Sequence, residues 1–495
     1  MSATQPSTAA VAAEVAGTTS RTEADALFRP RAIAVIGASS DATRIGGRPI
    51  DYTRRGGFAG ALYPVNPNQR EIQGIPAFAS VSVIPGEVDL AVIALPAKAA
   101  PQAVEECIAK GVRAIVMFSS GFAEINAAGR AVQDAMRERC VKAGVLLLGP
   151  NCLGVMNIHV GMMLTFSTIL ESIWPERGRV AVVSQSGAVG AYSAALAMER
   201  GVGLSQWVAT GNEADIDVAR CIQWLAEDDA TGTIMAYLEG CRDMARLRSA
   251  FEAAARHRKA VLMLKSGITD TGRSAVTAHT GSDAGDNAGY EELFNATGVY
   301  RARSIEEQVD MAYACANGVF PRGPRLAVIS ISGGVGVLAA DAARAAGLEL
   351  PPPGAETQRQ IKQLVPFSSP ANPVDVTAQI INDMGLFNRI LALVAAESAF
   401  DSVIIFLQQL GKVEKHFHGF RSAMLEARRQ HPEKLFVLCG GYSAEARSEM
   451  EAAGFLIFED PARAANVVGG LARLNQGFAR FNPSSAGRTT QSKET

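Results

Sequence analysis

The sequence predicts an α/β protein made of three doubly wound units, each built on a parallel sheet. Short apolar runs that end in Gly, Pro or Ser alternate with helical stretches along the chain, and this alternation is typical of parallel sheets. Three of the strands run into a turn of small residues and then a helix, at residues 37–40, 184–187 and 331–334. In such folds, ligands bind at the carboxyl ends of the strands.

Length and composition agree with a globular protein of about three domains. The chain has 495 residues, of which 48% are hydrophobic and 19% are charged, with a formal net charge of -2. This length suits roughly three domains of ordinary size. Because no run of Lys and Arg is interleaved with aromatic residues, we expect no nucleic-acid partner.

Cysteine and histidine usage predicts a cytoplasmic protein without a metal site. The seven cysteines are scattered, odd in number and free of CxxC pairs, which fits reduced thiols. No HExxH motif occurs among the six histidines. Residues 1–22 lack a basic leader pattern and predict a disordered tail. No stretch has the roughly 18 uninterrupted apolar residues that a membrane span needs.

The first unit offers an anion cradle. A buried strand at residues 31–40 leads into residues 41–50, which open a helix around Gly46 and Gly47. Backbone N–H groups and the helix dipole favour phosphate there. An empty turn between strand and helix is the alternative. The spacing is not the G-x-G-x-x-G of dinucleotide sites.

The following strands favour coenzyme A over NAD as the ligand of this unit. The second strand ends in Val65-Asn66-Pro67, where an NAD site would place an acidic residue for the ribose. A nucleotide with a 3′-phosphate, such as coenzyme A, fits better. Further strands at residues 89–97, 111–122 and 144–155 complete the sheet. One edge of the predicted sheet then holds Ala38, Ser39, Val65, Asn66, Leu95, Pro96 and Gly121.

A second unit begins with the strand and helix at residues 178–201. Ser186 is a suitable N-cap, and the N–H groups after Gly187 would face an anion, although a capped helix without a ligand fits equally. The strand at residues 233–240 ends on Glu239. A carboxylate in that place can hydrogen-bond an imidazole and fix its tautomer, and a surface glutamate is an equal alternative.

Residues 265–287 are rich in Gly, Ser and Thr and carry His279 near their centre. We expect a loop there, between a strand at residues 261–265 and a helix at residues 287–297. A third unit starts at residue 325, where Gly333 and Gly334 open another helix. Two such helix starts converging on His279 would suit a phosphohistidine. Taken alone, a histidine in such a loop is more often exposed and without a function.

The motifs VIGASS, IGG, YPVNP, GPNCLG, SQSGA, GNEADID, YLEG, KSG, AHTG and ISGGVGVLAAD together resemble the NDP-forming acyl-CoA synthetases. These are relatives of succinyl-CoA synthetase and of ADP-forming acetate–CoA ligases. The motifs follow the family's order from about Leu27 to about Gly469. The resemblance implies a Rossmann-like CoA-binding domain at residues 23–150. Two flavodoxin-like domains would follow, one with the catalytic histidine loop at 151–320 and a ligase domain at 321–478, before a disordered tail at 479–495.

The resemblance also implies roles for individual residues. His279 matches the histidine that takes phosphate from an acyl phosphate, and Glu239 matches the glutamate that holds it. The implied CoA-binding residues are Gly37, Ala38, Ser39, Ser40, Arg44, Gly46, Gly47, Val65, Asn66, Pro67, Leu95, Pro96 and Gly121. The implied phosphate- and acyl-binding residues are Asn151, Ser184, Gln185, Ser186, Gly187, Ala188, Gly333 and Gly334.

The implied reaction converts a carboxylate, CoA and a nucleoside triphosphate into acyl-CoA, nucleoside diphosphate and phosphate. Two departures from the family pattern stand out. Ala278 replaces the usual Ser before His-Thr-Gly, and we find neither an ATP-grasp region nor a Walker motif. We therefore expect a separate ATP-grasp subunit of β type that binds ATP or GTP with Mg, and hence a hetero-oligomer.

Two other functions are weighed against this one. A non-catalytic CoA-binding or acyl-CoA-binding regulatory module would have lost the histidine or the glutamate, and this chain retains both. An NAD-dependent dehydrogenase is disfavoured by the turn spacing and by the Val-Asn-Pro strand end.

Overall fold

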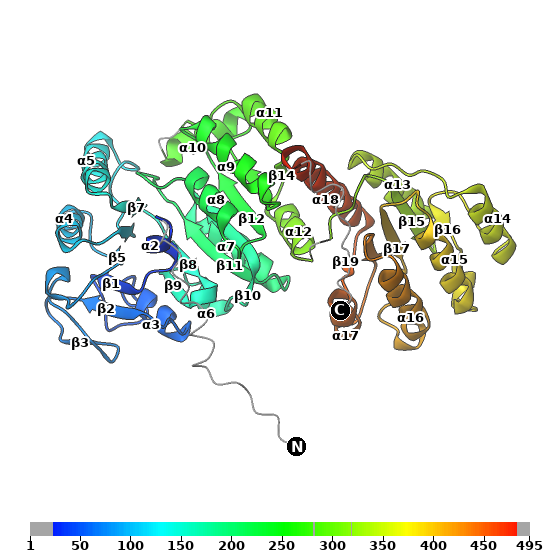
Figure 1. The fold of residues 1–495 in the computed structure, drawn as a ribbon, viewed down its shortest axis with the longest axis horizontal. Helices are drawn as coiled ribbons and strands as arrows, with labels where there is room; N and C mark the ends of the chain where they lie inside the picture. Colours follow the sequence, from blue (N-terminus) through cyan, green and yellow to red (C-terminus); the bar gives the residue numbers. More distant parts are fainter. Residues whose placement is uncertain (1–22, 281–282, 318, 483–495) are drawn as a thin grey trace, which may run out of the picture.

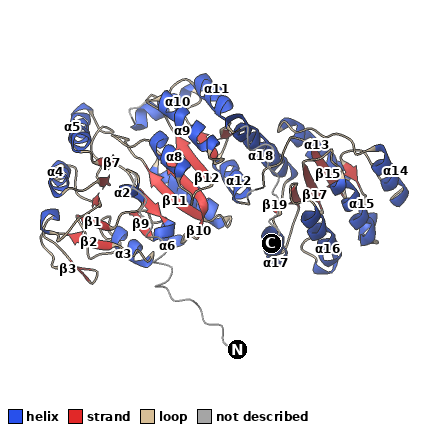
Figure 2. Ribbon diagram, in the orientation of Figure 1, coloured by secondary structure: helices blue, strands red, loops and turns tan. Residues whose placement is uncertain are grey.

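The computed structural model describes residues 23–280, 283–317 and 319–482. Three sheets follow one another along the long axis of the molecule, each with helices on its faces (Figures 1 and 2). The α/β class with parallel-sheet domains, predicted from the alternation of apolar runs and helical stretches, is confirmed.

The first sheet has the order β2-β1-β5-β6-β7, and all its strands are parallel. Its apolar strands are β1 (Ala32–Ile36), β2 (Ala61–Val65), β5 (Leu90–Ile93), β6 (Ala114–Met117) and β7 (Leu146–Leu148). Its helices are α2 (Asp25–Phe28), α3 (Arg48–Arg55), α4 (Ala100–Lys110) and α5 (Ala127–Ala143), with a short hairpin of β3 (Glu71–Ile72) and β4 (Ile75–Pro76) and a 3-10 turn, η1 (Val81–Val83).

The second sheet has the order β14-β13-β12-β10-β11-β8-β9. Its parallel strands are β10 (Arg177–Ser184), β11 (Leu204–Ala209), β12 (Thr233–Leu238), β13 (Ala260–Lys265) and β14 (Tyr300–Ala302). An antiparallel hairpin of β8 (Gly154–Asn157) and β9 (Met162–Thr165), which the sequence analysis did not predict, extends it beyond β11. Its helices are α6 (Ile169–Ser172), α7 (Gly187–Glu199), α8 (Val218–Glu227), α9 (Met244–Arg256), α10 (Asp270–Thr280), α11 (Asn287–Thr297) and α12 (Ile305–Ala316), with η2 (Ile158–Val160).

The third sheet has the order β16-β15-β17-β18-β19 and is parallel throughout. Its strands are β15 (Leu326–Ser330), β16 (Val374–Asp375), β17 (Ser402–Phe406), β18 (Leu435–Cys439) and β19 (Leu456–Phe458). Its helices are α13 (Gly333–Ala345), α14 (Ala355–Leu364), α15 (Met384–Ala396), α16 (Glu414–Gln430), α17 (Ala444–Ala452) and α18 (Pro461–Phe481), with η3 (Ala378–Ile381).

All three sheets share one topology. Numbered along its own parallel strands, each has the order 2-1-3-4-5. In this doubly wound order, strand 2 lies on one side of strand 1 and strand 3 on the other, so the order of the strands reverses between strands 1 and 3. Ligands bind at the carboxyl end of the gap between these two strands. The turn after β1, β10 or β15 lies at this position in each sheet. The three turns singled out in the sequence are therefore structural equivalents.

The sequence analysis predicted one loop at residues 265–287. This prediction is wrong, because α10 (Asp270–Thr280) occupies the middle of the stretch. Thr269 caps the helix by accepting a hydrogen bond from the Gly272 amide at 3.0 Å. Val276 is buried, with 7% of its surface exposed. A side-chain cap and one buried apolar position thus support a helix where Gly, Ser and Thr predicted a loop.

Helix α18 joins the third sheet to the second, and the sequence analysis did not predict it. It packs against α12 and α9 on one side and against α13 on the other. Arg463 in α18 donates two hydrogen bonds to Asp310 in α12, at 2.7 and 2.8 Å. Residues 479–481, assigned to a disordered tail, belong to this helix. The predicted tails at 1–22 and 483–495 lie outside the described residues.

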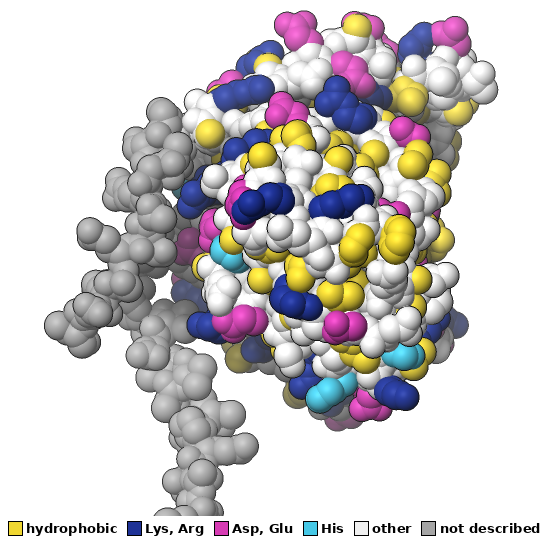
Figure 3. All heavy atoms as spheres, turned by 90° about the vertical axis from the view of Figure 1, so that its right-hand side faces the viewer, with side chains coloured by type: hydrophobic (Ala, Val, Ile, Leu, Met, Phe, Trp, Pro, Cys, Tyr) yellow, Lys and Arg dark blue, Asp and Glu magenta, His cyan; other side chains and the backbone are white. Residues whose placement is uncertain are grey.

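Two absences concern the described ranges only. No helix within them is both long and apolar enough to cross a membrane. No group of three or more His, Cys, Asp or Glu side chains within them is arranged to hold a metal ion. On the face shown in Figure 3, positive and negative side chains are interspersed.

Candidate functional site

A cleft of about 550 Å³ opens at the carboxyl end of β1. Six residues predicted to bind CoA line it, namely Gly37, Ala38, Ser39, Arg44, Gly46 and Asn66. The Gly37 and Ala38 amides donate to the Val65 carbonyl at 3.1 and 3.2 Å. A Cβ atom on Gly46 would lie 2.0 Å from the Gly37 carbonyl oxygen, so the floor of the cleft requires glycine at this close approach.

The other residues predicted for this site lie around the cleft. The Ser40 hydroxyl hydrogen-bonds the Gln69 side chain at 2.6 Å, and Gly47 is the residue before α3. Pro67 directly follows Asn66. Leu95, Pro96 and Gly121 follow β5 and β6 at the same sheet edge. The Ser119 hydroxyl links those two strand ends by donating to the Leu95 carbonyl at 2.5 Å.

The turn at residues 184–187 begins α7 on the second sheet. The Ser184 hydroxyl donates to the Ser186 carbonyl at 2.6 Å. The Ser186 hydroxyl accepts a hydrogen bond from the Val189 amide at 3.4 Å, so the prediction that Ser186 is the N-cap of α7 is confirmed. Asn151 is close by in the chain segment whose Leu153 side chain abuts Gly187. Ala188 follows in the first turn of α7.

Gln185 points into the protein. Its amide nitrogen donates to the Glu213 carboxylate and to the Gly240 carbonyl, both at 2.8 Å. Its amide oxygen accepts from the Glu239 and Gly240 amides, at 2.5 and 3.2 Å. Because a carboxamide has two N–H donors and one acceptor oxygen, this amide has no donor left for a phosphate.

Glu239 directly follows β12 and is 7% exposed. The Tyr237 hydroxyl donates to its carboxylate at 3.2 Å. Its backbone carbonyl accepts from the Lys265 ammonium at 2.7 Å. Burial lowers the pKa of Lys265 to about 8. The predicted position of Glu239 at the carboxyl end of a parallel strand is confirmed.

His279 lies in the last turn of α10, and its side chain is outside the described residues. Asp283, four residues after His279, lies against the strand end that holds Glu239. A Cβ atom on Gly240 would lie 2.2 Å from the Asp283 carbonyl oxygen, so glycine is required where the two segments meet. The fold therefore brings Asp283, four residues after His279, to the sheet edge that holds Glu239.

Gly333 and Gly334 open α13 on the third sheet, after the N-cap Ser332. No hydrogen bond or ion pair within the described ranges connects this turn with the one at residues 184–187. Convergence of the two helix starts on His279 stays a prediction.

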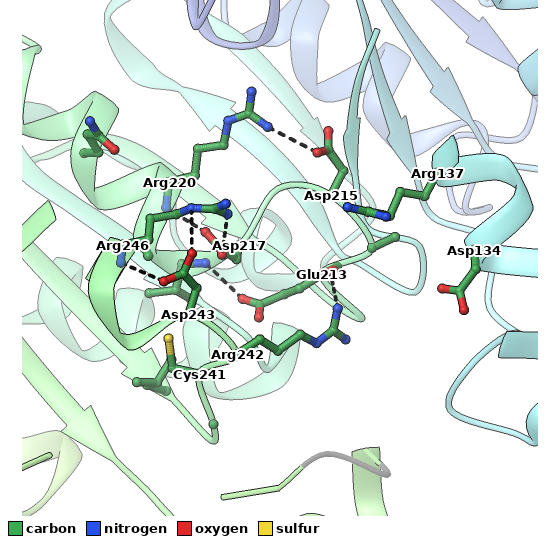
Figure 4. Close-up of a pocket in the computed structure, with 16 residues that line it drawn as sticks. Asp134, Arg137, Glu213, Asp215, Asp217, Arg220, Cys241, Arg242, Asp243 and Arg246 are labelled. Atoms are coloured by element: carbon green, nitrogen blue, oxygen red, sulfur yellow. Dashed lines mark hydrogen bonds and ion pairs between the residues drawn. The ribbon is translucent and has the colours of Figure 1, made fainter. Parts of the chain in front are cut away.

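The sequence analysis missed a charged cleft of about 510 Å³ at the same edge of the second sheet. It lies between α5 and the loops that follow β11 and β12 (Figure 4). Arg242 donates to the Glu213 carbonyl at 3.0 Å, and Arg246 pairs with Asp217 at 3.1 Å. Glu239 directly follows β12, whereas Glu213 lies in the loop four residues past the end of β11, so the strand-end reasoning that selected Glu239 points less directly to Glu213.

Glu213 lies beside this cleft and is 9% exposed. Its carboxylate accepts hydrogen bonds from Gln185 at 2.8 Å, from the Thr210 hydroxyl at 2.9 Å and from the Val218 amide at 3.0 Å. Burial raises the pKa of Glu213 to about 7. This carboxyl group is therefore poised between its two protonation states near neutral pH.

Two protein-family models match this chain, one over the first sheet and one over the second. Residues 31–158 match the family model of a CoA binding domain. Residues 177–315 match that of a succinyl-CoA ligase like flavodoxin domain.

Similar proteins match across most of the chain. The alpha subunit of ADP-forming acetate–CoA ligase II from Pyrococcus furiosus is 34% identical over 442 residues, covering 88% of this chain and 94% of the relative. ADP-forming acetate–CoA ligase I from Archaeoglobus fulgidus is 36% identical over 91% of this chain, which spans only 63% of that longer relative. The structure of acetyl-coenzyme A synthetase 1 from Ca. Korarchaeum cryptofilum, in complex with phosphate and ADP, superposes with a TM-score of 0.82 at 31% identity. The match covers 94% of this chain and 99% of that one.

Proposed function

This chain belongs to the family of NDP-forming acyl-CoA synthetases that includes the ADP-forming acetate–CoA ligases, and from this membership we propose that it is the α-type part of an NDP-forming acyl-CoA ligase. The ligase joins a small carboxylic acid to CoA and converts a nucleoside triphosphate into diphosphate and phosphate. His279 carries the phosphoryl group, and Glu239 holds the imidazole.

The observation that carries the proposal is the contact of Asp283, four residues after His279, with the strand end of Glu239. The 2.2 Å approach of Asp283 to a Cβ on Gly240 fixes that packing. A buried carboxylate at this place accepts a hydrogen bond from the imidazole, which fixes the ring and supports the positive charge that develops on it. The helix start at Gly187 lies at the same edge and offers N–H groups to the phosphoryl oxygens.

Written in the direction of nucleoside triphosphate formation, the reaction has three balanced steps. Phosphate attacks the thioester of acyl-CoA, which forms an acyl phosphate and releases the CoA thiol. The His279 nitrogen then attacks phosphorus, the bond between phosphorus and the acyl oxygen breaks, and the carboxylate leaves. Finally, a nucleoside diphosphate takes the phosphoryl group from His279. The first two steps use the CoA cleft and the edge of the second sheet.

We assign the last step to an ATP-grasp subunit that binds ATP or GTP with Mg. The Pyrococcus relative is named a subunit alpha, and this chain covers 94% of it. The Archaeoglobus relative is longer than this chain, so the alternative is one longer chain that carries both parts. The first arrangement makes the protein a hetero-oligomer.

The first experiment uses 32P-labelled acetyl phosphate and the purified chain, beside His279→Ala. We expect base-stable, acid-labile label on the wild-type chain and none on the variant. CoA binding is measured on both proteins as the folding control. Absence of label from a wild-type chain that still binds CoA would contradict the proposed function and leave a CoA-binding module.

A further inference from the structure

The backbone polar groups of Glu239 and Gly240 form hydrogen bonds with side chains that lie in, or directly after, the neighbouring strands. The Gln185 amide oxygen accepts from both of their backbone amides, and the Gln185 amide nitrogen donates to the Gly240 carbonyl. The Lys265 ammonium donates to the Glu239 carbonyl. All four backbone polar atoms of this dipeptide thus end on side chains. The position of the Glu239 carboxylate therefore depends on how Gln185 is oriented.

Glu213 holds that orientation together with the backbone groups of Glu239 and Gly240. An amide group can be turned by 180° about its last bond with little change in shape, so its neighbours decide which end is the oxygen. An ionised carboxylate only accepts hydrogen bonds, which requires the Gln185 nitrogen to face Glu213 at 2.8 Å. The Gln185 oxygen must then face the amides of Glu239 and Gly240. Glu213 is itself fixed by the Thr210 hydroxyl and the Val218 amide.

We propose that Gln185 and Glu213 are positioning residues that act through Glu239 to orient His279 for phosphoryl transfer. The inference rests on the proposed function and goes beyond it. It also changes the assignment of Gln185, which the sequence analysis placed among the phosphate ligands. With both donors used inside the protein, the Gln185 side chain holds the strand end, and phosphate contacts fall to the backbone N–H groups of α7.

The size of the expected effect follows from the geometry. If Gln185 is removed or turned, two buried amides lose their acceptor and the end of β12 shifts. Misplacing a reacting group by about 1 Å costs about a hundredfold in rate. Substitutions at this pair should therefore slow His279 phosphorylation and leave the CoA cleft on the first sheet unchanged.

The test measures the rate of label transfer from 32P-labelled acetyl phosphate to the full chain. We expect Gln185→Ala and Glu213→Leu each to lower the rate about tenfold to a hundredfold. Glu213→Gln keeps an acceptor oxygen for Gln185 and should stay within about threefold of wild type. Asp134→Asn changes another carboxylate that lines the same cleft and should match wild type. The CoA dissociation constant should be the same for all five proteins and shows that each is folded.

A double-mutant cycle separates positioning from a general structural role. If Gln185 acts through Glu239, adding Gln185→Ala to Glu239→Gln should cost no more than about a further twofold. Independent roles would multiply the two effects. Multiplied effects, or a wild-type rate in Gln185→Ala, would overturn the inference. Glu213→Leu serves the same purpose if Gln185→Ala does not fold, since it keeps the Gln185 side chain and removes only the carboxylate that helps to orient it.

The outcomes distinguish this inference from the proposed function. A wild-type chain that takes no label contradicts the proposed function itself. A wild-type chain that takes label at His279, together with Gln185→Ala and Glu213→Leu that take label at the same rate, overturns the positioning role alone.

Discussion

The turns that begin α7 and α13 have the same backbone chemistry and different connections. Both follow the first strand of a 2-1-3-4-5 sheet and read S-x-S-G-x-x-G, at residues 184–190 and 330–336. In each, the hydroxyl of the first Ser donates to the carbonyl of the second, at 2.6 Å in one turn and 2.8 Å in the other. Each turn opens a helix of 13 residues.

The residues beside the two turns differ at the neighbouring strand end, where the proposed reaction takes place in the second sheet. Ser184 pairs with Tyr237 on β12, and Ser330 pairs with Phe406 on β17. Two residues further on, Glu239 in the second sheet therefore corresponds to Gln408 in the third. Gln185, which bonds to Glu239, corresponds to Ile331, which packs against the apolar core of the third sheet.

This difference shows that the start of a helix is not sufficient for the proposed phosphoryl-transfer site. Both turns present backbone N–H groups to an anion. Within the described residues, the second sheet adds a buried carboxylate and an amide that holds it, and the third sheet has an amide and an apolar side chain at those places. The account assigns imidazole chemistry to the second sheet and at most anion binding to the third.

The largest expected effect is the loss of the carboxylate on the second sheet. Glu239→Gln should slow labelling of His279 from acetyl phosphate by at least about a hundredfold, because an amide in place of the orienting carboxylate gives a histidine the wrong hydrogen-bond partner. Gln408→Ala, at the equivalent place on the third sheet, should label at the wild-type rate. Equal slowing in both variants would remove the distinction between the sheets.

A smaller effect should appear in the pH dependence. Burial raises the pKa of Glu213 to about 7, and only the ionised form accepts from Gln185 without a competing proton. The labelling rate should therefore rise with pH through about 7, and Glu213→Gln should lose this part of the rise. A rise that survives in Glu213→Gln belongs to other groups, the imidazole included. Superimposable pH profiles of the two proteins would contradict the account.

The buried thiols and the phenol that face Glu213 do not titrate in that range. The charged or titratable groups that face it are Asp217, Arg242, Cys221, Cys241 and Tyr290. Burial raises the pKa of the Cys221, Cys241 and Tyr290 side chains, that of Cys241 to about 11. Cys221, Cys241 and Tyr290 therefore keep their charge state while Glu213 titrates near pH 7.

Stability should follow the opposite sign. A carboxyl group whose pKa rises on folding, here from 4.5 to about 7, favours the folded state most below pH 4.5. That contribution is lost as the pH rises through about 7. The free energy of unfolding should therefore fall between about pH 4.5 and about pH 7, and the labelling rate should rise at the upper end of that range. Glu213→Gln should flatten both curves.

The smallest expected effect concerns the two helix caps. Ser186 caps α7 with a side-chain hydrogen bond, and Ser332 makes no such bond at α13. Ser186→Ala should cost about 1 kcal/mol of local stability, and Ser332→Ala should cost only a few tenths. Hydrogen exchange of the first turns of α7 and α13 measures both, since local opening controls exchange there. Equal acceleration in the two helices would show that the caps are equivalent.

The fold could be predicted from sequence because its signals are local. The apolar runs became strands, and α11 begins at Asn287 and ends at Thr297, as predicted. Helix α10 was missed because its cap and its buried Val276 count for little in a stretch of Gly, Ser and Thr. Hairpin β8–β9 was missed because its pairing with β11 depends on the rest of the sheet.

The candidate site was predictable only in part. Glu239 could be found because the end of a parallel strand is readable from sequence. The roles of Gln185, Glu213 and Lys265 could not, because their bonds join residues 26 to 55 positions apart. Such contacts exist only once strands β10, β11, β12 and β13 lie side by side.

The central claim is that the CoA cleft on the first sheet and His279 on the second serve one phosphoryl-transfer path. The direct test incubates the chain with acetyl-CoA and 32P-labelled phosphate and then locates the label by peptide mapping. The account predicts acid-labile label on His279 and an equal amount of released CoA. In His279→Ala we expect no label on the protein, and only the small amount of released CoA that matches the acyl phosphate held in the site. Label on another residue, or labelled His279 without release of CoA, would contradict it.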